Sequence, residues 1–266
     1  MSPYYFILWA FMQDYLVFTI DEAIKLTGLG IYIEDLKALV VADLHLGYEE
    51  ALSQQGIYVP PIQLSSIKQV ISDMLSQTDA SRLILLGDVK HEFGSALRQE
   101  WKEVLELFSW LKERGLRIDV VRGNHDNFLI PILKRLEIPL HDPFLKEGKY
   151  FFVHGHKPLP VEAYGEDIEY IFMGHEHPAV IFRDDLGIKI KFKCFLEGRI
   201  DSKTLFVLPA LSPLMAGTEV NVEEAGRLSP ILKSLDLDSF RVYVVDLEAG
   251  IYDFGELRLL KTLTYE

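Results

Sequence analysis

The chain contains five short apolar runs that each end in a polar segment rich in aspartate and histidine. The runs are 39–42, 83–86, 118–121, 150–153 and 170–173, and they are followed by Asp43-Leu44-His45, Gly87-Asp88, Gly123-Asn124-His125-Asp126, His154-Gly155-His156 and Gly174-His175-Glu176-His177. Apolar runs of this length, bounded by polar turns, are typical of buried strands. The pattern therefore favours a fold that gathers several strand ends, with their polar side chains, at one place.

Between these runs the chain shows helical patterns, and after His177 it shows mainly extended ones. Residues 61–76 and 96–114 have apolar residues at helical spacing, with Pro61 near the first turn of one and Gly115 after the other. Alternating strands and helices predict crossover connections and at least partly parallel pairing. The last third is expected to be a β meander, with strands at 179–182, 188–195, 204–208, 241–247 and 251–260 and turns at 184–187 and 197–199.

Composition limits the size of the fold and the choice of partners. A chain of 266 residues with 49% apolar and 25% charged residues fits a globular protein, as one α/β domain spanning 1–266 in preference to two small ones. The formal charge of −13 makes an acidic surface, which repels a phosphate backbone. Extended duplex DNA binding is therefore not expected, although a local cleft lined by metal or basic groups remains compatible with this charge.

The single cysteine and the N-terminal segment bear on the compartment. Cys194 cannot form an intrachain disulfide, which fits a reducing, cytoplasmic environment. Residues Pro3 to Met12 are apolar and aromatic, but a membrane span takes roughly 20 such residues. Residues 1–15 are expected to form an extra strand or an apolar extension in preference to a membrane-surface anchor, and no membrane span is expected.

The residue types in the five polar segments suit metal ions. An Asp-x-His pair offers one oxygen and one nitrogen ligand, and His-x-His offers two nitrogens on one side of an extended backbone. Asp88 can bridge two ions with its two oxygens, and Asn124 can offer an amide oxygen. Two divalent ions roughly 3.5–4 Å apart can bind a bridging hydroxide that attacks a phosphoryl group. We therefore expect a dinuclear metal site.

In this order and spacing, the five segments resemble the signature of the calcineurin-like metallophosphoesterases, across residues 39–178. Cys194-Phe195, Leu208-Pro209-Ala210 and Ala216-Gly217 further resemble small microbial phosphoesterases. These are related to the double-strand-break repair nuclease and to the metallophosphoesterases associated with DNA ligases. The resemblance implies a four-layer α/β fold (α+β in some schemes), in which a two-sheet β-sandwich core is flanked by helices. It also implies a hydrolase.

The resemblance also implies the ligands of two divalent ions. One ion would be held by Asp43, His45, Asp88 and His177, and the other by Asp88, Asn124, His154 and His175. His156 is an alternative to His154. Manganese is the first expectation, with iron, zinc, nickel and cobalt also compatible.

Three further residues are candidates for the catalytic site. The resemblance implies that His125 faces the phosphate and stabilises charge or protonates the leaving oxygen. His91 follows Asp88 by three residues, as in the repair-nuclease branch, and is expected to face the phosphate or support the ligands. Asp126 either helps to hold this loop or is a structural cap.

The expected function is phosphodiester hydrolysis. Phosphoprotein phosphatases of this superfamily carry an arginine shortly after Gly-Asp, and such an arginine suits a terminal phosphate. Here Gly87-Asp88 is followed by Val89-Lys90-His91-Glu92, which favours a small phosphodiester or single-stranded nucleic acid as substrate. A DNA or RNA nuclease in repair is the alternative, and a phosphomonoesterase or a non-enzymatic scaffold is less favoured.

Overall fold

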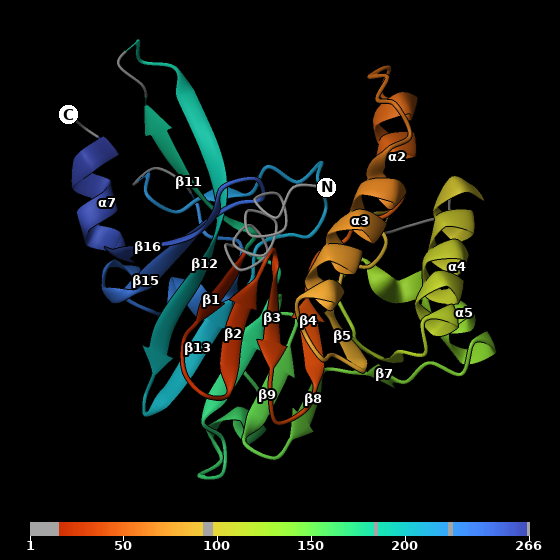
Figure 1. Ribbon diagram of the computed structural model, residues 1–266, viewed down its shortest axis with the longest axis horizontal. Helices are drawn as coiled ribbons and strands as arrows, with labels where there is room; N and C mark the ends of the chain where they lie inside the picture. Colours follow the sequence, from red (N-terminus) through yellow and green to blue (C-terminus); the bar gives the residue numbers. More distant parts are fainter. Residues whose placement is uncertain (1–15, 93–97, 184–185, 223–225, 265–266) are drawn as a thin grey trace, which may run out of the picture.

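Two β-sheets stacked face to face form the centre of the molecule, with helices outside both (Figure 1). The computed structural model describes residues 16–92, 98–183, 186–222 and 226–264. The expected two-sheet core flanked by helices is confirmed. The interpretation of the apolar segment from Pro3 to Met12 concerns residues outside the described ranges.

The first sheet has seven strands in the described part of the chain, and their spatial order follows the sequence. Strands β1 to β4 pair antiparallel, and β4 to β7 pair parallel. The strands are β1 (Val17–Thr19), β2 (Ile24–Thr27), β3 (Gly30–Ile33), β4 (Ala38–Val41), β5 (Arg82–Leu86), β6 (Arg117–Val121) and β7 (Leu140–His141). Three of the five apolar runs therefore form adjacent parallel strands, as the alternating pattern predicts.

The second sheet has nine strands among the described residues, seven of them in the order β14-β11-β12-β13-β10-β9-β8. They are β8 (Phe144–Glu147), β9 (Tyr150–Val153), β10 (Tyr170–Met173), β11 (Pro178–Arg183), β12 (Lys189–Ile200), β13 (Lys203–Val207), β14 (Thr218–Glu219), β15 (Arg241–Asp246) and β16 (Gly250–Glu256). Strand β15 pairs with β12 and β16. The two remaining apolar runs are β9 and β10, which lie side by side and parallel.

Alternating side chains of the second sheet supply two separate cores. Phe152, Phe172 and Phe206 project toward the first sheet, and their rings stack at centroid distances of 5.2 and 5.6 Å. Their sequence neighbours Phe151 and Ile171 lie in the other core, with α6 and α7. Because successive side chains of a strand point to opposite faces, this sheet is apolar on both sides.

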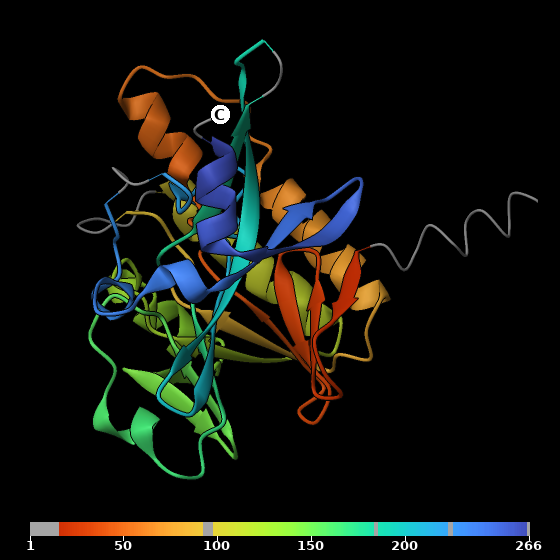
Figure 2. The ribbon, with the colours of Figure 1, turned by 90° about the vertical axis from the view of Figure 1, so that its left-hand side faces the viewer.

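Helices complete the outer layers, as Figures 1 and 2 show. The α-helices are α2 (Tyr48–Gln54), α3 (Gln63–Ser76), α4 (Arg98–Glu113), α5 (Ile130–Arg135), α6 (Pro230–Lys233) and α7 (Leu257–Thr264), and the 3-10 helices are η1 (Asp126–Phe128), η2 (Val161–Tyr164) and η3 (Leu237–Ser239). Helices α3 and α4 confirm the two predicted helices and bury Ile67, Ile71, Val104 and Phe108 in the core between the sheets. Within the described ranges, no helix has both the length and the apolar character to cross a bilayer.

Two expectations for the last third were wrong. The expected turn at 197–199 lies inside β12, because Gly198 fits against the ring of Phe240, where a Cβ atom would lie 2.3 Å from that ring. Residues 257–260 are helical instead of extended. Leu257 and Leu260, three residues apart, both pack into the second core at the start of α7.

A buried ion-pair network joins the two sheets at the edge near β7 and β8. Arg82 of β5 is 4% exposed, and its Nε donates to Asp119 Oδ2 at 2.8 Å. Its Nη1 donates to Glu147 of the second sheet, and His141 lies 2.8 Å from Asp119 Oδ1. Burial alone would raise the pKa of Asp119, but the hydrogen bonds from His141 and Arg82 outweigh it and hold the pKa below its usual value.

We expect Asp119→Asn to lower the free energy of unfolding at pH 7 by about 3 kcal/mol, because it breaks a buried ion pair. A carboxyl whose pKa is lowered by folding stabilises the protein above its unfolded-state pKa, and this contribution is lost as the pH falls through the lower folded value. Urea denaturation at pH 7 and pH 3 should therefore show the difference from wild type shrinking in acid. Asp167→Asn, in the exposed pair with Lys146, is the control and should change little. An equal loss in both variants would contradict this account.

Candidate metal centre

The loops after β4, β5, β9 and β10 are hydrogen-bonded to one another, so strand ends of both sheets meet. His45 N donates to the carbonyl of Asp88 at 2.9 Å, and Gly174 N donates to that of His154 at 3.0 Å. Across the sheets, His175 N donates to Asp43 Oδ2 at 2.9 Å. The segments that the sequence predicts to converge therefore do converge.

Three groups of side chains in the described part of the chain offer ligand atoms within 4.8 Å of one another. They are Asp43, His45 and His177; Asp88, His154 and His175; and His45, His91 and His125. The first two groups contain six of the seven expected ligands. The seventh, Asn124, has its Oδ1 3.0 Å from His154 Nε2.

Asp88 belongs to the second group and also faces His45 of the first. Its Oδ1 accepts the N–H of His125 at 2.9 Å. Its Oδ2 lies 3.2 Å from His154 Nε2 and 3.9 Å from His45 Nε2. One carboxylate oxygen therefore faces both groups, whereas the sequence suggested a bridge that uses the two oxygens.

The geometry favours His154 over His156 as a ligand. His154 Nδ1 lies 2.7 Å from the carbonyl oxygen of Leu86, so this nitrogen carries the proton and Nε2 points to Asp88. A ligating histidine is held in this way by a bond from its other nitrogen. His156 belongs to none of the three groups that the described residues form.

His125 and His91 lie beside the same cluster. His125 Nδ1 contacts the carbonyl oxygen of His91, and its Nε2 lies 3.7 Å from Asp88 Oδ2. The ring of His91 packs on Tyr48 at a centroid distance of 4.2 Å. The side chain of His125 is 13% exposed, which leaves it access to a bound molecule.

Asp126 is fully buried and serves the backbone. Its carboxylate accepts the N–H groups of Asp88 at 2.9 Å, Val89 at 3.0 Å and Gly123 at 2.9 Å. Of the two interpretations left open by the sequence, these bonds support the one in which it holds the loop. Through these bonds it ties the Gly87-Asp88 turn to the Gly123-Asn124 turn and acts as a positioning residue.

Five expected ligands have left-handed backbone conformations that residues other than glycine rarely adopt. Their φ angles are +58° at Asp43, +48° at His45, +49° at Asp88, +67° at His175 and +51° at His177. Each costs of order 1 kcal/mol and persists only where the surroundings enforce it. Such a concentration of strain is typical of a functional site.

Glycine permits the close approach of two of these turns. A Cβ atom on Gly123 would lie 2.2 Å from Asp88 Oδ1, and one on Gly87 would lie 2.6 Å from His154 Nδ1. Any side chain at either position would displace a ligand. The glycines beside the aspartate and asparagine are therefore part of the site.

The protonation states suit cation binding. Burial lowers the pKa of His45 to about 3 and that of His175 to about 4. Burial alone would raise the pKa of the Asp43 and Asp88 carboxyls, but nearby imidazoles outweigh it and lower both. At neutral pH the carboxylates are ionised and these two imidazoles are neutral, which is the state that metal ligands need.

The surroundings of the two carboxylates also favour added positive charge. Burial lowers the pKa of His154, but Asp88 and Asp43 outweigh it and raise the pKa to about 9. His45 Nδ1 is buried and has no hydrogen-bond partner among the described residues, and Asp43 Oδ1 lies 3.3 Å from His177 Nε2 and 3.7 Å from His154 Nδ1. Buried carboxylates that face several imidazole nitrogens and hold a proton on one of them fit the binding of divalent ions.

Buried polar residues outside the expected set support this cluster, and sequence patterns did not indicate them. Glu100 Oε1 of α4 accepts the N–H groups of His91 at 3.0 Å and Glu92 at 2.9 Å. Glu176 accepts the N–H of Ser229 at 2.8 Å. A single glutamate on a helix looks like a solvated surface residue. Only the position of Glu176 between two histidines hinted at a role.

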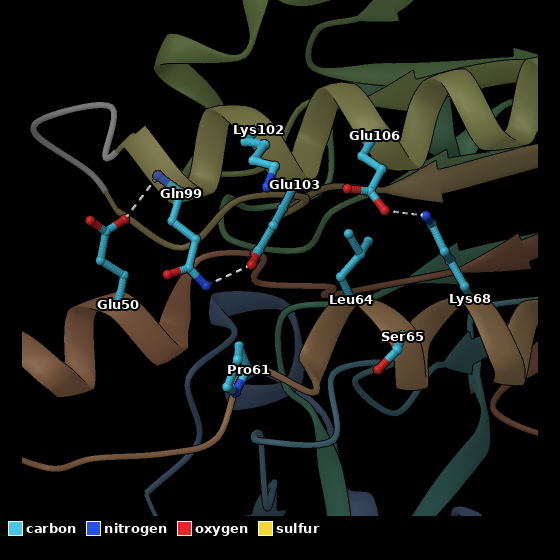
Figure 3. Close-up of a pocket in the computed structure, with 9 residues that line it drawn as sticks. All are labelled: Glu50, Pro61, Leu64, Ser65, Lys68, Gln99, Lys102, Glu103 and Glu106. Atoms are coloured by element: carbon cyan, nitrogen blue, oxygen red, sulfur yellow. Dashed lines mark hydrogen bonds and ion pairs between the residues drawn. The ribbon is translucent and has the colours of Figure 1, made fainter.

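The cavity in Figure 3 is separate from the cluster. It measures about 930 Å³ and lies between α2, α3 and α4. Its lining includes Lys68 and Glu106, which form an ion pair at 2.7 Å, and none of the expected ligands. One lining residue, Glu103, accepts the N–H of Gly47 at 3.2 Å and so contacts the loop that carries His45.

The family model of the calcineurin-like phosphoesterases matches residues 36–179, more than half of the 266 residues. This chain therefore belongs to the calcineurin-like phosphoesterase family, and it is a metal-binding hydrolase that acts on phosphoester bonds. The resemblance inferred from the five motifs is confirmed. No curated protein matches the sequence.

Solved structures to which this chain is similar include a nuclease and a phosphoesterase. Nuclease MPE of Pseudomonas putida has 22% identity and a TM-score of 0.58, with 87% of this chain and 94% of that chain covered. YfcE, a phosphoesterase from E. coli, has 18% identity and a TM-score of 0.41, with 82% of this chain and 98% of that chain covered. The first likeness supports the two-sheet fold.

We expect His154→Ala to lose about one divalent ion per chain, because one of two ion groups loses a central ligand. His156→Ala is the matched control and should retain the wild-type metal content. Elemental analysis of protein reconstituted with Mn²⁺ and freed of excess metal measures both. Loss of metal from His156→Ala with full retention in His154→Ala would reverse the assignment of these two histidines.

Proposed function

We propose that this protein is a phosphodiesterase that uses two divalent ions. One ion would be held by Asp43, His45, Asp88 and His177, and the other by Asp88, Asn124, His154 and His175, with manganese as the first expectation. The observation that carries the proposal is the position of Asp88 Oδ2, which faces the histidines of both groups. A shared carboxylate suits a pair of ions at short separation.

When bound, the two ions would supply an activated water and neutralise charge on the phosphoryl oxygens. The residues of the chain orient the substrate beside them and assist the leaving group. His125 is suited to the second task, because the carbonyl group of His91 holds its Nδ1 and leaves Nε2 near Asp88. Burial lowers the pKa of His125, and an anionic phosphate next to the ring would favour its protonated form.

The surroundings of the cluster support a diester in preference to a monoester. Two cations near the motifs could replace the missing arginine, namely Lys90 and Arg122. Lys90 is 2% exposed and lies 3.6 Å from Glu100 Oε2. Arg122 donates to Asp142 and to Asn127. Because both cations have carboxylate or amide partners, neither is placed to grip a terminal phosphate.

The substrate is proposed to be a small phosphodiester or single-stranded nucleic acid. A nuclease is the second candidate, because a structure of the same fold is named a nuclease. The charge of −13 disfavours long contacts with duplex DNA.

With Mn²⁺ present, we expect bis-p-nitrophenyl phosphate to be hydrolysed with a higher kcat/KM than p-nitrophenyl phosphate, since no arginine grips a terminal phosphate. A chelator should abolish both activities, and Mn²⁺ should restore them. Labelled single-stranded and duplex oligonucleotides in the same assay test the nuclease candidate. Preference for the monoester would contradict the diesterase proposal.

We expect His125→Ala to lower kcat and kcat/KM together by about 100-fold, because a general acid acts mainly in the transition state. The metal content should stay at the wild-type value. His141→Ala is the control, since this ring bonds to Asp119 in the network that joins the sheets, and its kcat should not change. Loss of bound metal in His125→Ala would show that His125 is a ligand instead.

A further inference from the structure

Gln63, the first residue of α3, packs against the loop that carries Asp43 and His45. Its side chain is fully buried. Nε2 of Gln63 lies 2.9 Å from the carbonyl oxygen of His45, 3.2 Å from that of Leu44 and 2.8 Å from Oγ of Ser212. One amide group of a helix therefore contacts the backbone of two adjacent residues of the metal loop.

The Gln63 amide matters most to the carbonyl group of Leu44. His45 N and Leu46 N donate to the carbonyl groups of Asp88 and Val89, and the carbonyl oxygen of His45 also accepts the N–H of Tyr48 at 3.3 Å. For the carbonyl of Leu44, the Gln63 amide is the donor found among the described residues, and a carboxamide supplies its N–H groups without adding charge. A buried carbonyl left without a donor would destabilise the loop.

Gln63 reaches Asp43 through Ser212. The N–H of Ser212 donates to the carbonyl oxygen of Asp43 at 3.2 Å, and the hydroxyl of the same serine lies beside the Gln63 amide. The left-handed conformations of Asp43 and His45 are thus held by one connected set of contacts.

The position of Gln63 is itself fixed by a residue outside the expected ligand set. Oε1 of Glu49, a buried residue of α2, accepts the N–H of Ile62 at 2.7 Å and the N–H of Gln63 at 2.6 Å. A carboxylate at the start of a helix is stabilised there by the unpaired N–H groups. The amide is therefore held in place by contacts that do not involve the ligands.

We propose that Gln63 is a positioning residue that holds Asp43 and His45 in ligand geometry for one ion and does not act on the ion held by His154. This inference rests on the proposed two-ion centre. Residues that orient ligands raise metal affinity, and their loss typically weakens it 10–100-fold. The expected effect is therefore confined to one of the two binding steps.

The test is a Mn²⁺ titration of metal-free protein by calorimetry. Gln63→Leu keeps a bulky uncharged side chain at this buried position and removes the donors. We expect one binding step to weaken by about 10–100-fold and the other to stay unchanged. Gln69→Leu is the matched control, because Gln69 is exposed on the same helix and donates to Asp73. It should leave both steps unchanged.

Two further variants make the outcome decisive. His45→Ala removes a ligand of the same ion, so it should lose the step that Gln63→Leu weakens. Gln63→Asn keeps the amide but shortens its reach, and it should weaken the same step even if Gln63→Leu fails to fold. Unchanged steps in a folded Gln63 variant, or equal weakening of both steps with lower thermal stability of the metal-free protein, would overturn the proposal. Fewer than two ions bound to wild type would contradict the two-ion centre instead.

Discussion

Mutual repulsion among buried carboxylates is the constraint around which this molecule is arranged. Asp43, Asp88 and Asp126 are almost fully buried where the two sheets meet. Burial and the charge of Asp88 raise the pKa of Asp126 to about 6, and both also oppose ionisation of Asp43, where nearby imidazoles outweigh them and lower the pKa. Such a cluster is stable only if positive charge or hydrogen-bond donors surround it. Imidazoles and backbone N–H groups supply part of that need, and divalent ions suit the remainder.

The strained turns follow from this constraint. Strand ends from two sheets must deliver their side chains to a small volume, and ordinary backbone conformations would point several of them elsewhere. Asp126, Glu100 and Gln63 hold the turns through backbone groups and lie outside the expected ligand set. Each is a buried polar side chain with hydrogen-bond partners, which makes its burial acceptable. The turns that carry the cluster are thus held by buried residues that are not expected ligands themselves.

The sequence predicted the features that have local signals. Apolar runs identified β4, β5, β6, β9 and β10, and the polar residues after them identified the cluster. Features that depend on distant neighbours escaped prediction. Gly198 resembled a turn because the ring of Phe240 that it packs against lies 42 positions later. Gln63 resembled an ordinary helix residue because its partner Ser212 lies 149 positions away. Asp126 remained ambiguous until its three backbone donors were located.

The distribution of the cluster over five strand ends has a consequence for divergence. Helices α2 and α3 connect β4 to β5, and α4 lies between β5 and β6, so long stretches of chain separate the reactive segments. Insertions or substitutions on the outward faces of those connections reshape the outer surface and leave the strand ends where they are, as long as buried residues such as Gln63 and Glu100 keep their contacts. In such a scaffold, the surface that contacts a substrate or partner can diverge while the residues that act on the phosphoester bond stay the same.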